Sequence, residues 1–100
     1  MIPAFYSTLW MAMTKTANRC GYALALHGSM NRDIDMVAIP WVDDCDTGFQ
    51  LVAKLCKNHG LTASRPLKAF KPHGRVAYGL VLSGSHYVDL SVMPRLAVLK

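Results

Sequence analysis

The spacing of apolar side chains predicts two amphipathic helices. In residues 7–20 the apolar positions recur every three or four residues, as on the buried face of a helix, with Ser7 suited to the N-cap and Gly21 to the C-cap. A second helix follows the acidic segment 43–46, whose aspartates are expected to favour its N-terminus rather than to form a metal site, and Gly60 ends it. The apolar faces consist of Trp10, Met13, Ala17 and Cys20 in the first helix and Phe49, Val52, Ala53 and Cys56 in the second.

Four apolar runs predict strands, over residues 22–27, 32–39, 75–82 and 87–93. The first run is apolar throughout, which is typical of a central strand. Pro40 should end the second, because proline has no N–H to donate to a neighbouring strand. Gly84 suits a tight turn between the last two, and residues 62–74 are expected to be irregular. The pattern therefore predicts an α+β fold with two helices and about four strands.

Composition indicates one folded domain covering residues 1–100, because 52% of the residues are hydrophobic and disordered chains contain far fewer. The apolar runs are too short to cross a bilayer and the first residues do not form a secretory signal, so we expect a cytoplasmic protein with no membrane partner. The apolar tail, residues 94–100, is expected either to pack back or to pair with another copy of the chain, which would give a homo-oligomer.

The charges are unevenly distributed between the two signs. Eleven Lys and Arg stand against six acidic residues, all of them Asp, and the net charge is +5. Such a basic surface favours a polyanionic partner, such as a nucleotide or nucleic acid, although it also serves solubility. The three cysteines are widely spaced and predict neither a disulfide framework nor a zinc site. Among the histidines, His27 stands out because it directly precedes Gly28 and Ser29, though it can equally cap a strand end.

Two aspartates on the second apolar run are the main chemical feature. Asp33 and Asp35 are one residue apart, so in a strand both carboxylates emerge on the same face. Two like charges among apolar neighbours repel each other and lose hydration unless a cation neutralises them. Mg²⁺ with phosphate oxygens is a common partner of such a pair. Asp89 lies in the middle of the last strand, where its apolar neighbours Val88 and Leu90 argue against a simple solvated role.

The chain from about residue 21 to residue 93 resembles the polymerase-beta-type nucleotidyltransferase superfamily. The resemblance consists of an apolar strand ending in Gly28 and Ser29, the Asp33-x-Asp35 pair on a second strand and Asp89 on a later one. It implies a small mixed sheet with helices on one face and catalytic Asp33, Asp35 and Asp89 as Mg²⁺ ligands. It also implies that Asp89 helps to activate the attacking hydroxyl, and that Gly28 and Ser29 contact the phosphates of a nucleotide.

The same core also resembles that of short bacteriophage proteins. The shared features are Gly28-Ser29, Asp33-x-Asp35, Pro40-Trp41 and the closing run 89–94. This resemblance implies a phage-encoded protein that acts in the cytoplasm of the host cell.

The sequence departs from the superfamily between Ser29 and Asp33. Only three residues separate them, where the superfamily usually has about ten that form a turn and a short helix at the phosphates. The amides and dipole of that helix would be missing, or replaced by Arg32, whose guanidinium can bind phosphate with two hydrogen bonds. Arg75, where the basic segment meets the start of the third predicted strand, is a second expected nucleotide contact.

Several functions are compatible with this pocket. The interpretation we favour is a nucleotide-binding protein that has kept the fold and sequesters a nucleotide or nucleotide-derived signal of bacterial immunity. The alternatives are an active Mg²⁺-dependent nucleotidyltransferase that modifies a protein, RNA or small molecule, and an antitoxin-type interaction partner. In a purely structural interpretation, Asp33 and Asp35 pair with Arg32 and Arg75 and no metal binds.

Overall fold

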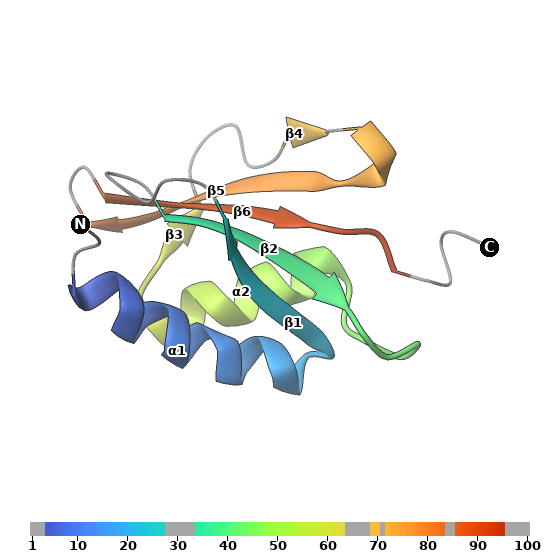
Figure 1. Cartoon of the computed structure of the whole chain (residues 1–100), viewed down its shortest axis with the longest axis horizontal. Coiled ribbons are helices and arrows are strands. Elements are labelled where there is room, and N and C mark those ends of the chain that lie inside the picture. The colour runs from blue at the N-terminus through green and yellow to red at the C-terminus, as the bar shows by residue number, and fades with distance from the viewer. Residues whose placement is uncertain (1–3, 28–33, 64–68, 71, 84–85, 96–100) are drawn as a thin grey trace.

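The structure, a computed structural model, describes residues 4–27, 34–63, 69–70, 72–83 and 86–95. Within them the chain forms two α-helices, six strands and one 3₁₀ helix, which confirms the predicted α+β class (Figure 1). The elements are α1 (Ala4–Arg19), β1 (Tyr22–His27), β2 (Ile34–Pro40), α2 (Gly48–His59), β3 (Thr62–Ala63), β4 (Ala69–Phe70), η1 (Pro72–Gly74), β5 (Val76–Ser83) and β6 (His86–Val92).

The strands form one mixed sheet, as expected. Its order is β1-β2-β6-β5-β3, with β4 pairing to β5 outside this path. β1 is therefore an edge strand, and the predicted central position is wrong, because Tyr22 and Leu24 are buried against the helices while Ala23 and Ala25 of the same apolar run are exposed. The β2–β6 pair is parallel and the other pairs are antiparallel. The described part of the sheet thus has six strands rather than about four. The additional strands, β3 and β4, have two residues each, which is too short for a hydrophobic pattern to reveal, and they lie in the segment that we expected to be irregular.

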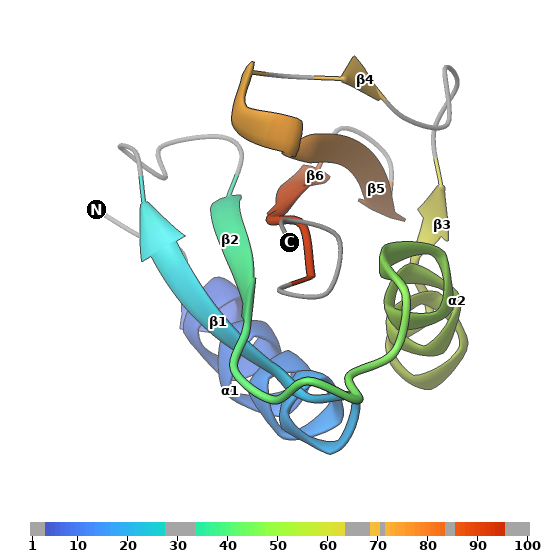
Figure 2. The ribbon, with the colours of Figure 1, turned by 90° about the vertical axis from the view of Figure 1, so that its right-hand side faces the viewer.

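Both helices cover the same face of the sheet (Figures 1 and 2). Alternate strand residues point toward the helices and are buried, and the core consists mainly of Tyr22, Leu24, Ile34, Met36, Ala38, Leu80, Val88 and Leu90 from the sheet with Tyr6, Met13, Ala17, Leu51 and Leu55 from the helices. We call the opposite face of the sheet, away from α1 and α2, the open face. Among the described helices, none is long and apolar enough to cross a membrane.

Helix α1 differs from the prediction only at its ends. It starts at Ala4 instead of residue 7, so Ser7 lies within the helix and is exposed rather than serving as the N-cap. Met13 and Ala17 are buried as predicted. Gly21 follows the helix with a φ of 92°, the left-handed conformation expected of a C-cap glycine.

The N-terminus of α2 is capped by Thr47 and not by the preceding aspartates. The Thr47 hydroxyl accepts from the Gln50 N–H, and the Gln50 side chain accepts from the Thr47 N–H. The Asp46 carboxylate instead accepts from Lys54 Nζ at 2.6 Å, two turns into the helix. Lys54 lowers the pKa of the Asp46 carboxyl by this hydrogen bond. The predicted capping role of the acidic segment is therefore wrong, because an adjacent threonine and glutamine form a complete capping box.

The buried face of α2 is also rotated from the predicted one. Leu51, Val52 and Leu55 are buried, whereas Phe49 is 64% exposed and Ala53 is exposed. The spacing of three and four residues fits both faces, because this helix carries six apolar residues distributed around it. Gly60 ends the helix in the left-handed conformation, as predicted.

Pro40 is the last residue of β2 rather than the residue after it, and it lies opposite Tyr22 of β1. The pairing of β2 with β6 stops at Ala38 and Val92. A missing N–H at residue 40 therefore interrupts no ladder hydrogen bond. In the hairpin formed by β5 and β6, the predicted turn residue Gly84 lies outside the described residues.

Gly21 and Gly60 allow a matched test of backbone strain and steric contact. Both have positive φ, but a Cβ on Gly21 would lie 2.5 Å from Cys45 Cβ, whereas one on Gly60 would meet nothing within 4 Å. Gly60→Ala should cost about 1–2 kcal/mol, the cost of left-handed backbone for an L-residue. Gly21→Ala should cost clearly more, about 3 kcal/mol or above, because the loop that contains Cys45 must also shift. Urea unfolding of both variants measures the difference, and equal losses would contradict the packing at Gly21.

A hydrogen bond between the helices predicts a pH dependence of stability. Thr16 Oγ1, on a buried residue of α1, lies 2.8 Å from His59 Nε2 on α2. Burial, and then the nearby Arg19, lower the pKa of His59 from its usual 6.5. The unfolded chain therefore takes up this proton first, so the free energy of unfolding should fall as the pH drops below about 6.5.

His59→Gln should flatten this dependence between about pH 7.5 and pH 5.5, as measured by urea unfolding at each pH. His27→Gln, which removes an exposed histidine from β1, is the control. An unchanged pH profile in His59→Gln would exclude His59 as the source.

Candidate functional site

The parallel pairing of β2 with β6 brings two of the predicted aspartates together. Asp35 lies directly opposite Asp89 in the register. Neighbouring strands are about 4.8 Å apart, and residues in register present their side chains on the same face. Asp35 and Asp89 alternate with the buried residues Ile34, Met36, Val88 and Leu90, so both carboxylates belong to the open face.

The same register extends this pair into a row across four strands. His27 of β1 is the register partner of Asp35, and Gly79 of β5 is the partner of Asp89. We call His27, Asp35, Asp89 and Gly79 the carboxylate row. Because Gly79 has no side chain, β5 places nothing beside Asp89 in this row. His27, noted in the sequence only because it precedes Gly28, is thus a neighbour of Asp35.

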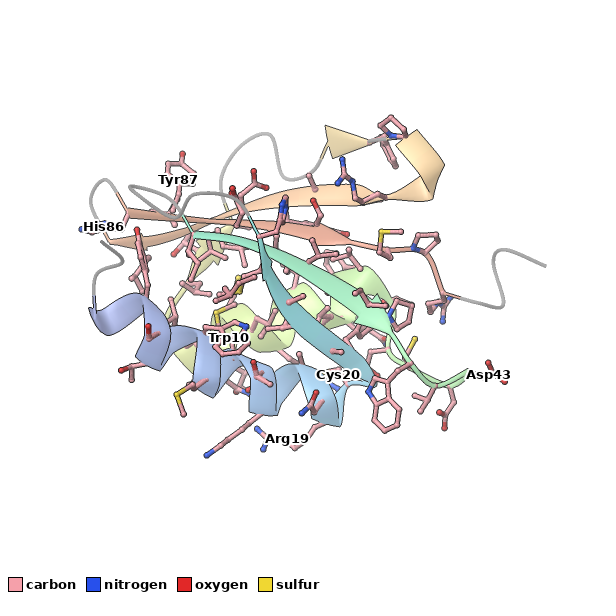
Figure 3. The ribbon with its side chains drawn as sticks, viewed as in Figure 1. Trp10, Arg19, Cys20, Asp43, His86 and Tyr87 are labelled. Carbon is pink, nitrogen blue, oxygen red and sulfur yellow. The ribbon has the colours of Figure 1, made fainter. Side chains whose placement is uncertain are left out.

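Exposure distinguishes the two carboxylates. Asp89 is exposed and Asp35 is partly buried. The sequence correctly indicated that Asp89 lies on a strand with a buried face, but its apolar neighbours point to the opposite face and leave its carboxylate accessible. Tyr87, two residues before Asp89, is 40% exposed and projects from the sheet away from the helices (Figure 3). The strand alternation, once the register is known, identifies Tyr87 as part of the same surface.

The remaining residues of the predicted pocket cannot be placed in the same way. Gly28, Ser29, Arg32 and Asp33 lie outside the described residues, so the roles expected of them stay predictions. The connection that contains them joins the end of β1 to the start of β2, and both of these ends adjoin the carboxylate row at His27 and Asp35.

Arg75 lies at a distance from the carboxylate row. It precedes β5 and stands four residues from Gly79, a separation of about 13 Å along an extended chain. Arg75, Asp35 and Asp89 are all among the described residues. The structure shows no ion pair between Arg75 and either of these two aspartates. The buried Nε of Arg75 has no hydrogen-bond partner within the described part of the chain. Arg75 is therefore not paired with Asp35, whereas Asp33 lies outside the described residues, and the contact of Arg75 with a nucleotide stays a prediction.

The carboxylate row fits the oxygen donors that Mg²⁺ prefers. Two carboxylates that face each other across one strand spacing, with an accessible side, can share a divalent cation. Within the described residues no three His, Cys, Asp or Glu side chains are close enough to hold a metal ion. A complete site would therefore need Asp33 in addition to Asp35 and Asp89.

Comparison with known proteins supports the fold. No protein-family model and no curated protein sequence matches the chain. Among solved structures, it is similar to a cytoplasmic RNA terminal U-transferase, with a TM-score of 0.65 and 18% identity over 97% of this chain. The chain spans 32% of the length of that protein. The likeness shows that this chain shares its fold with part of that protein.

Magnesium should stabilise the protein through the carboxylate row. At a concentration ten times its dissociation constant, Mg²⁺ should raise the free energy of unfolding by about 1.4 kcal/mol, a shift of several degrees in melting temperature for a chain of this size. Asp35→Asn should abolish the shift and slightly stabilise the metal-free protein, because like charges directly opposite each other repel. Calorimetry or a dye-based melt at constant ionic strength measures both effects.

The matched control for this prediction is Asp43→Asn, which removes an exposed carboxylate from the loop before α2 (Figure 3). It should leave the magnesium response intact. A response that survives in Asp35→Asn, or that is lost equally in Asp43→Asn, would exclude the carboxylate row as the metal site.

Proposed function

We propose that this protein binds a nucleotide on the open face, with its phosphates at the carboxylate row and Mg²⁺ between them. The observation that carries the proposal is the register that places Asp35 opposite Asp89. Two adjacent carboxylates would repel a phosphate unless a cation neutralised them, so a phosphate ligand and a divalent cation are expected together. When bound, Mg²⁺ would neutralise charge on the phosphates.

Residues around the carboxylate row would supply the other contacts. Gly79 leaves room beside Asp89 for a ligand to approach the sheet, and the exposed ring of Tyr87 offers an aromatic surface on which a base can stack. Gly28 and Ser29 with Arg32 are proposed to hold the phosphates, because their short connection begins directly after His27 and leads to Asp33 and Asp35. The basic net charge of +5 favours capture of a polyanion.

We further propose that binding, rather than rapid turnover, is the activity. Nucleotidyl transfer requires the reacting phosphate to be held in line with the attacking hydroxyl, and a misplacement of about 1 Å can lower the rate on the order of a hundredfold. Three residues between Ser29 and Asp33 are too few to form a helix whose N-terminus faces the phosphates. We propose that a protein of this kind sequesters a nucleotide signal of bacterial immunity.

The second candidate is an active nucleotidyltransferase. It is favoured by the retention of Asp33, Asp35 and Asp89, since a protein that only binds an anion gains nothing from carboxylates in its pocket. The fold likeness to an RNA terminal U-transferase is compatible with it. Under this hypothesis Asp89 would help to activate the attacking hydroxyl, as the resemblance to the nucleotidyltransferase superfamily implies.

One experiment separates the two candidates. The protein is incubated with each labelled nucleoside triphosphate and Mg²⁺ in the presence of cell extract, free nucleotide is removed, and the retained label is released by heat and analysed. We expect stoichiometric retention of nucleotide that is released unchanged. Retention should fall at least tenfold in Asp35→Asn and remain in Asp43→Asn, because only the former alters the carboxylate row.

Two other results would overturn the proposal. A labelled protein, RNA or small-molecule product that disappears in Asp89→Asn would establish the enzyme instead. Absence of retention and of product with all four triphosphates, at low salt and with Mg²⁺, would exclude a nucleoside triphosphate ligand.

A further inference from the structure

The sheet has one long edge that no described strand covers. β1 pairs with β2 on one side and ends the strand order on the other (Figure 2). The opposite end of the sheet consists of β3 and β4, which have two residues each. An edge of six residues presents a row of unpaired backbone groups, and natural proteins usually block such edges with charges, proline or a bulge.

The direction of the free backbone groups follows from one hydrogen bond. The Trp41 N–H donates to the Gly21 C=O at 3.0 Å, so Gly21 and Trp41 form a hydrogen-bonded pair at the end of the β1–β2 ladder. In an antiparallel ladder such pairs alternate, so Ala23, Ala25 and His27 direct their N–H and C=O groups toward β2. Tyr22, Leu24 and Leu26 therefore direct theirs away from the sheet.

The side chains at this edge do not block pairing. β1 contains no Lys, Arg, Asp, Glu or Pro, although the chain as a whole carries a net charge of +5. On the open face it presents the exposed methyl groups of Ala23 and Ala25. Their partners on β2 are Ile39, which is 45% exposed, and the partly buried Val37. The edge is thus uncharged and bordered by an exposed apolar strip.

We propose that β1 pairs antiparallel with β1 of a second copy of this chain, about a twofold axis at Leu24. In this register Leu24 lies opposite Leu24 of the second copy, Tyr22 opposite its Leu26, and Ala23 opposite its Ala25. It is the register in which every outward N–H and C=O of Tyr22, Leu24 and Leu26 finds a partner in both copies. Residues in register also share a face, so the buried and open faces of the two sheets remain continuous.

A second copy suits this edge better than a charged peptide. An acidic segment drawn to the basic protein would find no Lys or Arg on β1 to pair with. Two copies of β1 meet without like charges, and small alanine side chains meet alanines on the open face. The pairing leaves the carboxylate row uncovered, because it extends the sheet at its edge and not over its open face.

The interaction should be weak enough to be reversible. A single strand pair buries less than the roughly 1,200 Å² of a standard stable interface, so a dissociation constant in the micromolar range is expected. Sedimentation velocity over a dilution series into the submicromolar range should show a monomer–dimer equilibrium. A monomer throughout a series reaching hundreds of micromolar would overturn the proposal.

Hydrogen exchange on the unmodified protein tests the register. The amides of Tyr22, Leu24 and Leu26 should become more protected as protein concentration rises through the dimer range. The amides of Ala23, Ala25 and His27 already face β2 and should change much less. Protection that rises equally at both sets, or at neither, would exclude the proposed pairing.

Charge substitutions test the same register independently. Ala23→Lys/Ala25→Lys places lysines opposite lysines and should weaken dimerisation by about tenfold or more, and Ala23→Glu/Ala25→Glu should do the same. An equimolar mixture of the two variants should regain the dimer. The control, Thr62→Lys on exposed β3, should dimerise like the unmodified protein. Full dimerisation of both double variants would assign the contact to another surface.

Discussion

The parallel pairing between β2 and β6 is the constraint on which the site depends. Asp35 and Asp89 are far apart in the sequence, and the β2–β6 register is what places them opposite each other. The buried residues Ile34, Met36, Val88 and Leu90 fix the register, because a slip by one residue would turn every one of them toward solvent. Packing of the hydrophobic core thus determines where the Asp35 and Asp89 carboxylates lie, although both are on the opposite face of the sheet.

This arrangement explains how a small sheet tolerates adjacent like charges. The carboxylates lie on the open face, where water can hydrate them, while the opposite face of the same strands is covered by α1 and α2. Repulsion between the exposed Asp89 and the partly buried Asp35 is modest, and burial of the apolar residues behind them exceeds it. The same strands can therefore contribute both to the core and to a charged site.

Much of the fold could be predicted from the sequence, because the spacing of apolar residues indicates which face of a helix or strand is buried. The bounds of β1 are those predicted, and Gly21 and Gly60 end the helices as expected. Periodicity could not separate the two apolar faces of α2, and it could not detect β3 and β4, which are held by their pairing with β5 rather than by a pattern of their own. Thr47 was missed as the cap because the acidic residues beside it gave a competing signal.

Only part of the candidate site could be predicted from the sequence. The order of the motifs indicated Asp35 and Asp89, but their adjacency, and the presence of His27 and Gly79 in the same row, depend on a register that only tertiary structure fixes. Arg75 was assigned to the pocket from its charge and its place before a strand. Arg75 precedes β5, four residues from Gly79, and its place relative to the carboxylate row depends on a strand register that a single sequence does not reveal.

The position of β6 in the strand order also affects how the protein matures during synthesis. β6 lies between β2 and β5 in the sheet but is the last of the described strands to be synthesised, so until then β2 has only β1 beside it. The nascent chain can form the β1–β2 hairpin and both helices, but one side of β2 remains an unpaired apolar edge. Asp35 has no facing carboxylate during this period. The facing pair of carboxylates therefore forms only after β6 has been synthesised and has paired with β2.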